Sequence, residues 1–139
     1  MIVDSLMHRR IVAADASMSV RDAARLMRER RVGCVVATQG DEAVGIVTER
    51  DIAYRVVAAE RDPATTRLAD VMSAPIATIA PEATIEDAAA RMRELRIKRL
   101  VVLREGEAVG LVSVTDIAYA SPETGRAMLE TWVKQRWED

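Results

Sequence analysis

Two short segments of the chain place a hydroxyl side chain three positions before an aspartate, directly after an apolar run that contains a glycine. The pairs are Thr48 with Asp51 and Ser113 with Asp116. In one interpretation the hydroxyl residue caps the start of a helix and the aspartate completes a capping box. In the other, the positive end of the helix attracts a phosphate, and the carboxylate accepts hydrogen bonds from the vicinal hydroxyls of a ribose. A single segment of this kind favours capping.

The two segments correspond because the chain repeats itself. Displacing the sequence by 65 positions brings Asp51 onto Asp116 (116 − 51 = 65) without a gap. Other stretches match at the same displacement, namely Asp22-Ala23-Ala24 with Asp87-Ala88-Ala89, Met27-Arg28-Glu29 with Met92-Arg93-Glu94, and Glu42-Ala43-Val44-Gly45 with Glu107-Ala108-Val109-Gly110. Each copy of a repeat is a supersecondary unit that does not usually bury its apolar face alone. We therefore expect two half-domains packed with pseudo-twofold symmetry into one module, with a cleft between them.

Each copy predicts the order strand, helix, strand, strand, helix, and hence an α/β fold. Ser19 and Thr84 are placed to cap helices with an apolar rhythm of three to four residues. The two strands that follow are apolar throughout, which is typical of strands buried on both faces, and polar turns at Gly40-Asp41 and Glu105-Gly106 join them. The expected strands cover 11–13, 35–37 and 44–47 in the first copy, and 76–79, 100–103 and 109–112 in the second.

The chain divides by sequence into a first motif (1–64), a second motif (65–121) and a tail helix (122–139). Ser121-Pro122 has the pattern of an N-cap followed by proline at the first helical position. One face of the tail is apolar, and it carries Met128, Leu129, Trp132 and Val133, with Trp137 beyond them. Such a face either docks on its own domain or contacts a partner, and the residues leave both readings open.

Composition excludes several classes of protein. The chain has 139 residues, half of them apolar, and a net charge of −2, so it is expected to bind neither nucleic acid nor an anionic membrane through bulk charge. Cys34 is the only cysteine and His8 the only histidine, which leaves no disulfide, no metal cluster and no nucleophile with a base. We expect a non-enzymatic protein in a reducing cytoplasmic setting, without a signal peptide or a membrane span.

The segment Gly-apolar-Val-Thr/Ser-x-x-Asp-Ile is intact in both copies, at 45–52 and 110–117. With the tandem duplication, this segment makes the chain resemble the cystathionine-beta-synthase (CBS) domain pair, or Bateman module, from about Asp4 to about Ala120. The resemblance implies that the two copies pack sheet to sheet. It also implies that adenosine-containing ligands bind in the cleft between them, with Thr48 and Ser113 meeting phosphates or the ribose edge, and Asp51 and Asp116 meeting the ribose hydroxyls.

The resemblance assigns further positions unequally to the two copies. The first strand of each copy would line the adenine pocket, where the second copy has Thr78 and the first has Ala13, which offers only backbone groups. Residues that open the middle strand would face phosphates, and Lys98 holds that position in the second copy whereas Gly33 holds it in the first. The positive charge of the first half-site is then left to Arg50. This imbalance predicts that the second half-site binds a phosphorylated ligand more tightly.

Taken together, these features predict a stand-alone regulatory module that binds AMP, ADP or ATP and has no obligatory cofactor. A differential affinity between two arrangements is the only way such binding can transmit a signal. Because no effector domain is fused to the module, the signal would pass to an unidentified effector protein, and the module would form a homodimer through helix faces. The alternatives are a sensor of S-adenosylmethionine and a homodimeric interaction scaffold without a ligand.

Overall fold

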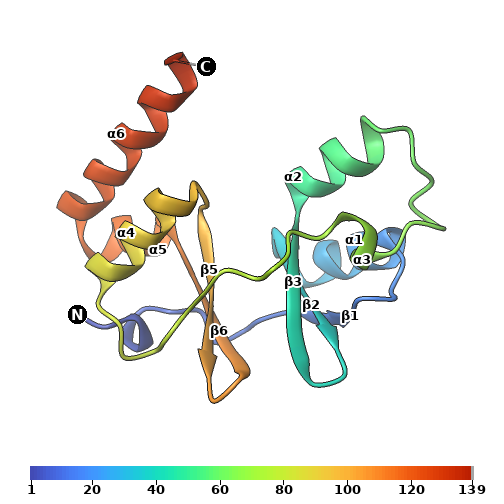
Figure 1. The fold of residues 1–139 in the computed structure, drawn as a ribbon, viewed down its shortest axis with the longest axis horizontal. Coiled ribbons are helices and arrows are strands. Elements are labelled where there is room, and N and C mark those ends of the chain that lie inside the picture. The colour runs from blue at the N-terminus through green and yellow to red at the C-terminus, as the bar shows by residue number, and fades with distance from the viewer. Residues whose placement is uncertain (139) are drawn as a thin grey trace. The chain divides into compact units, whose positions relative to one another are not determined.

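The computed structural model describes residues 1–138, with side chains as far as Gln135, so the side chain of Trp137 lies outside the described residues. The chain folds into two compact units (Figure 1). The first-motif unit is Ile11–Ala77, and the second-motif unit joins Met1–Arg10 to Thr78–Asp139. The first ten residues therefore pack with the second motif. The division predicted from the sequence, with boundaries after residues 64 and 121, separates sequence motifs rather than compact units. It stays a prediction.

The first-motif unit contains a three-stranded sheet in the order β1-β2-β3. Strand β1 (Ala13–Asp15) runs parallel to β2 (Cys34–Gln39), which pairs antiparallel with β3 (Glu42–Thr48). Helix α1 (Val20–Arg30) crosses between β1 and β2, as a parallel connection requires. Beyond β3 the chain forms α2 (Glu49–Ile52), continues as the π-helical stretch η2 (Ala53–Val57), and ends in the short helix α3 (Leu68–Val71).

The second-motif unit repeats this order. Its sheet is β4-β5-β6, formed by β4 (Thr78–Ile79), β5 (Arg99–Arg104) and β6 (Glu107–Ser113). The remaining elements are η1 (Val3–Ser5), α4 (Ile85–Leu95), α5 (Val114–Ala120) and the tail helix α6 (Pro122–Glu138). The α/β class, the element order of both copies and the C-terminal helix are confirmed. The first strands begin two residues later than expected, because ladder pairing with the middle strand begins only at Ala13 and Thr78. Strand β1 is therefore displaced from 11–13, and β4 is shorter than the expected 76–79.

The two long helices of the repeat begin and end in the same way. The Ser19 and Thr84 hydroxyls each accept a hydrogen bond from the backbone N–H three residues on, at 3.1 Å. A side-chain cap of this kind stabilises a helix by about 1 kcal/mol. Both helices then stop at an arginine in the left-handed conformation, Arg31 at φ 57° and Arg96 at φ 56°. The predicted N-caps are therefore confirmed.

A short segment outside the named strands pairs with the third strand of each unit. In the second-motif unit, His8 donates to the Leu111 carbonyl at 2.8 Å and accepts from the Leu111 N–H at 2.9 Å. In the first-motif unit, Ser73 exchanges the same two bonds with Ile46, at 2.9 and 3.2 Å. The methionine before each of these residues covers the glycine of the strand, so a Cβ on Gly110 would lie 2.7 Å from the sulfur of the methionine. The motif glycine is needed for this close approach.

Each unit has its own apolar core. The middle strands β2 and β5 are buried along most of their length, as their continuous apolarity predicts. Their fully buried partners include Val20, Val47 and Leu68 in the first-motif unit, and Met92, Ile117 and Met128 in the second. Cys34 is also buried. Within the described range, no helix combines the length and the apolarity needed to cross a bilayer.

Candidate functional site

The end of β3 and the start of α2 form a complete capping box. The Thr48 hydroxyl oxygen accepts a hydrogen bond from the Asp51 N–H at 3.2 Å. In return, Asp51 Oδ2 accepts from the Thr48 N–H at 2.8 Å and from the Thr48 hydroxyl at 3.1 Å. One carboxylate oxygen is therefore committed to the backbone, and the helix start is fixed without a ligand.

The same box recurs between β6 and α5. The Ser113 hydroxyl oxygen accepts from the Asp116 N–H at 3.2 Å, and Asp116 Oδ2 accepts from the Ser113 N–H and hydroxyl, both at 2.8 Å. Both aspartates are largely buried, with 12% of the Asp51 side chain and 13% of the Asp116 side chain exposed. The structure thus brings each predicted hydroxyl–aspartate pair together and confirms the capping interpretation of both.

Spacing alone does not produce this box. Ser19 precedes Asp22, and Thr84 precedes Asp87, by the same three residues. At those helix starts only the hydroxyl half of the cap forms. The Asp22 carboxylate instead lies 3.5 Å from Arg21 and 3.9 Å from Arg25. At the start of α3, Asp70 Oδ2 also accepts from the N-cap N–H, at 2.9 Å, but the Asp70 side chain is 43% exposed. Among the described helix starts, the two strand-to-helix junctions combine this bond with a capping hydroxyl and a largely buried carboxylate.

The second oxygen, Oδ1, distinguishes the two half-sites. Asp51 Oδ1 lies 3.9 Å from Arg55 Nε, which is too long for a hydrogen bond. Asp116 Oδ1 lies 2.7 Å from His8 Nε2. A carboxylate oxygen has two lone pairs, so Asp51 Oδ1 can take two further donors and Asp116 Oδ1 can take one.

His8 was expected to be a solvated surface residue, and the sequence did not predict its contact with Asp116. Its ring is 68% exposed, in keeping with a surface residue, yet it reaches a carboxylate 108 positions away. The signal available in the sequence was the repeat, since displacement by 65 aligns His8 with Ser73 beside the matched pair Met7 and Met72. The two copies therefore differ at this position in a side chain that touches the aspartate.

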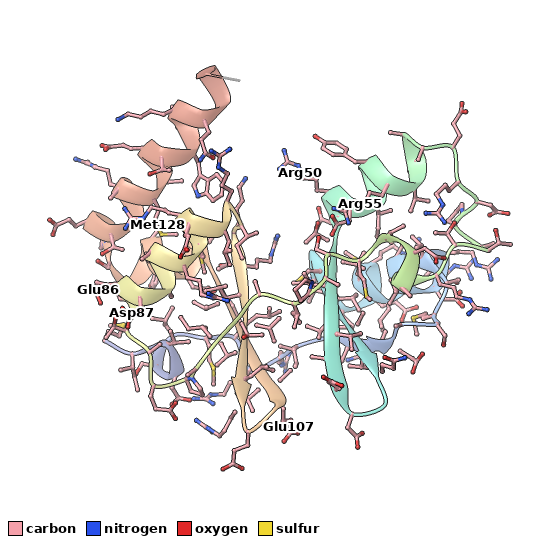
Figure 2. The ribbon with its side chains drawn as sticks, viewed as in Figure 1. Arg50, Arg55, Glu86, Asp87, Glu107 and Met128 are labelled. Carbon is pink, nitrogen blue, oxygen red and sulfur yellow. The ribbon has the colours of Figure 1, made fainter. Side chains whose placement is uncertain are left out.

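The cations assigned to phosphate binding have other contacts in the structure. Arg50 lies over the ring of Tyr54, 5.3 Å from its centroid, while the guanidinium of Arg55 donates to the Val71 carbonyl at 2.8 Å. Figure 2 shows Arg50 and Arg55 on the helix that begins with α2. In the second-motif unit, Lys98 lies 5.8 Å from the Trp132 ring centroid on α6. Arg50 and Lys98 do not contact the aspartates in this arrangement.

The two adenine-pocket candidates lie in equivalent rows of the two sheets. Ala13 pairs with Val36, which pairs with Ile46, two residues before the hydroxyl residue of β3. Thr78 occupies the same row through Val101 and Leu111 in the second-motif unit. The Thr78 carbonyl accepts a hydrogen bond from Arg91 Nε at 2.8 Å, so the threonine hydroxyl is the group it can offer a base.

Over the described residues, no group of three or more histidine, cysteine, aspartate or glutamate side chains could hold a metal ion. The pKa of Asp15 lies below its ordinary value because the Ser17 hydroxyl and backbone N–H donate to its carboxylate. Asp15 ends the first strand and belongs to a local turn.

Comparison with known proteins places these features in a family. The family model described as the CBS domain matches residues 3–58 and again residues 68–123. The CBS domain-containing protein YhcV of Bacillus subtilis is 30% identical over 116 residues, which is 84% of this chain and 82% of YhcV. An uncharacterized protein of Methanopyrus kandleri is 30% identical over 122 residues, and the chain spans 62% of its length.

One solved structure is of particular interest for the ligand. The CBS domain protein PAE2072 from Pyrobaculum aerophilum, complexed with AMP, is 30% identical and superposes with a TM-score of 0.75. The match covers 84% of this chain and 89% of PAE2072.

Proposed function

The chain belongs to the CBS domain family, and we propose that it is a regulatory protein whose two motifs bind an adenosine nucleotide (AMP, ADP or ATP) through Asp51 and Asp116. The observation that carries the proposal is that each capping box uses only Oδ2 of its aspartate. The box therefore fixes the carboxylate and presents Oδ1 for a ligand hydroxyl. The AMP bound to PAE2072 supports an adenosine ligand for a protein of this family.

The geometry gives each group a distinct part in binding. A ribose diol would donate to Oδ1, which the cap holds in place, so little ordering of the side chain would be needed on binding. The Thr48 and Ser113 hydroxyls would meet the phosphate or ribose edge. Ala13 and Thr78 would border the base.

The proposal keeps the unequal half-sites. Lys98 would leave Trp132 to meet a phosphate, at a cost of about 0.5–1 kcal/mol for an exposed cation–π contact. A hydrogen bond to a charged group contributes about 1.5–3 kcal/mol, which outweighs that cost. His8 takes one lone pair of the carboxylate at the same half-site and so weakens its hold on ribose. We expect phosphate to favour the Asp116 half-site and the sugar diol to favour the Asp51 half-site.

A thermal-shift screen with AMP, ADP, ATP and S-adenosylmethionine tests this function. A ligand present at a hundred times its dissociation constant adds about 2.7 kcal/mol of apparent stability. We expect the adenosine nucleotides to raise the melting temperature, and S-adenosylmethionine, which carries no phosphate for Lys98, to raise it less. A larger shift with S-adenosylmethionine would transfer the proposal to that ligand.

The second candidate function is an interaction scaffold that binds no small molecule. It is favoured by the fact that both aspartates already serve as helix caps. Absence of any shift with all four adenine ligands would select this function. In either case we propose a homodimer that acts in the cytoplasm on a separate effector protein.

A further inference from the structure

In the second-motif unit, the tail helix α6 covers the face that α4 and α5 present together. On that face Ala89, Met92 and Ile117 are completely buried, and so is Met128 of α6. Gly125 permits the close approach, because a Cβ there would lie 2.4 Å from the Cα of a residue on α5. The packing of α6 therefore demonstrates that a helix with small and apolar residues fits the face formed by α4 and α5.

The equivalent face of the first-motif unit has no such helix. Displacing the buried set by 65 positions gives Ala24, Met27 and Ile52. These residues line a groove of about 470 Å³ between α1 and the start of α2. The remaining lining residues are Arg28, Arg31, Val32, Gly33 and Glu49. The repeat therefore forms the same apolar surface in both units. In the second-motif unit α6 covers it, and in the first-motif unit it is open.

Charge distinguishes the open groove from the covered face. Glu49 stands where the second copy has Val114, which is buried. Arg28 and Arg31 lie on the same groove. In the part of the chain that the structure describes, none of these three charges has an ion pair. An occupant of the groove must therefore combine an apolar ridge with both an acidic and a basic group.

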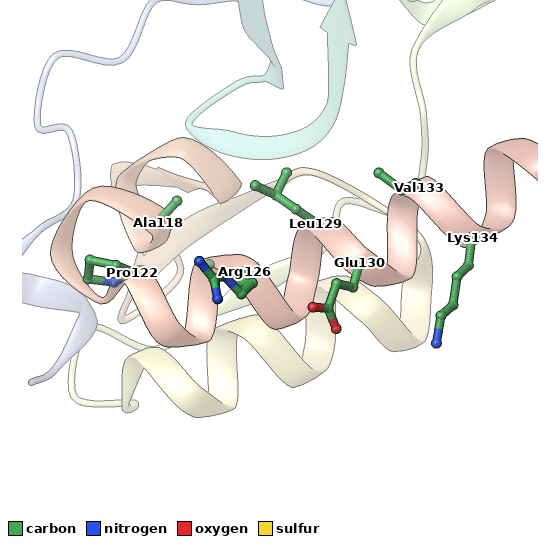
Figure 3. Close-up of a pocket in the computed structure, with 8 residues that line it drawn as sticks. Ala118, Pro122, Arg126, Leu129, Glu130, Val133 and Lys134 are labelled. Atoms are coloured by element: carbon green, nitrogen blue, oxygen red, sulfur yellow. The ribbon is translucent and has the colours of Figure 1, made fainter.

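The outer side of α6 has this combination. Leu129 and Val133 are 50% and 53% exposed, and Figure 3 shows them projecting side by side from the helix. Arg126, Glu130 and Lys134 follow along the same surface at intervals of four residues and line the same hollow. They form no ion pair among the described side chains either.

We propose that α6 of a second copy of this chain docks its Leu129–Val133 ridge into the α1–α2 groove. Glu130 then lies against Arg28 and Arg31, and a flanking cation of α6 lies against Glu49. Each chain carries one groove and one ridge, so two copies satisfy both contacts in a closed dimer. The inference deepens the homodimer part of the proposed function and does not depend on nucleotide binding.

Sedimentation equilibrium of the full chain without nucleotide tests the interface. We expect a dimer whose dissociation constant rises at least about tenfold in Glu130→Arg and in the pair Arg28→Glu with Arg31→Glu, since like charges then meet. Combining the three substitutions should restore much of the affinity. Val57→Glu is the matched control, because Val57 is also exposed but lies outside the groove and the ridge, and it should leave dimerisation unchanged.

Three results would overturn the interface. The wild-type chain would be a monomer throughout the accessible concentration range, or the charge reversals would leave the dimer intact, or the combined variant would fail to recover. Circular dichroism of each variant verifies folding. Titration of the same variants with AMP separates this result from the nucleotide proposal, because loss of the dimer with AMP binding retained, or the reverse, identifies which proposal has failed.

Discussion

Replacing the site aspartates by asparagine separates their capping role from their proposed ligand role. In Asp51→Asn the amide oxygen can take the place of Oδ2 and accept from the Thr48 N–H, which is now 2.8 Å from the carboxylate. The amide nitrogen then replaces Oδ1 and donates where a ribose hydroxyl needs an acceptor. The substitution therefore keeps the helix cap and removes the ligand contact. Asp116→Asn does the same in the second copy.

The two effects differ in size. Loss of the negative charge at a helix start costs about 0.3–1 kcal/mol of stability, whereas Asp51→Ala also leaves a backbone N–H unpaired and should cost about 1–3 kcal/mol. Loss of a hydrogen bond from ligand to a charged acceptor is worth about 1.5–3 kcal/mol. At 1.4 kcal/mol for each factor of ten, this weakens nucleotide binding about 10- to 100-fold.

Urea unfolding and calorimetric titration with AMP measure the two quantities on the same samples. Asp22→Asn is the control, since Asp22 has the same spacing from a capping serine but holds no backbone donor of that serine. It should leave the affinity unchanged and cost no more stability than the loss of a charge at a helix start, about 0.3–1 kcal/mol. The reasoning is refuted if Asp51→Asn and Asp116→Asn, separately and together, bind AMP as the wild type does. It is also refuted if the asparagine variants lose as much stability as the alanine variants.

Three further predictions concern stability and titration. Gly110→Ala should destabilise the protein by about 1–3 kcal/mol in urea unfolding, because its Cβ would meet a backbone carbonyl at 2.8 Å, whereas Gly45→Ala meets only a flexible methionine side chain and should cost less; equal costs would contradict this. Met128→Ala should cost about 2–5 kcal/mol, because the side chain that holds α6 is fully buried, and a loss below about 0.5 kcal/mol would show that α6 is not docked. Ser17→Ala should raise the pKa of Asp15 in an NMR titration, since the serine hydroxyl lowers it. The stability linked to Asp15 is present above the ordinary aspartate pKa and is lost as the pH falls through the lowered value, so this loss should shrink in the variant.

Local features of this fold could be predicted from residues close together in the chain. Ser19 and Thr84 identified their helices because an N-cap bond spans only three residues. The continuous apolarity of β2 and β5 predicted burial on both faces. Because the sequence repeats, each of these patterns occurs twice at equivalent positions. This includes the hydroxyl–aspartate pairs that begin at Thr48 and Ser113.

Contacts between distant segments could not be predicted in the same way. His8 meets Asp116 only because the first ten residues pack with the second motif, and no local pattern encodes that exchange. The apolar stripe predicted for α6 is wider than the part of the helix that is buried, because Leu129 and Val133 belong to the stripe but are exposed. Met128 is buried where α6 packs closely at Gly125, and Leu129 stays exposed. The docking interpretation therefore describes one part of the helix, and the partner-contact interpretation of the exposed part stays a prediction.

A crystal structure of the chain grown with saturating AMP tests the central claim most directly. The account predicts a ribose hydroxyl at hydrogen-bonding distance, roughly 2.6–3.2 Å, from Oδ1 of Asp51 or Asp116, with Oδ2 still bound to the backbone N–H of Thr48 or Ser113. AMP bound elsewhere on the chain, or both carboxylates engaged only as helix caps beside an empty site, would contradict it.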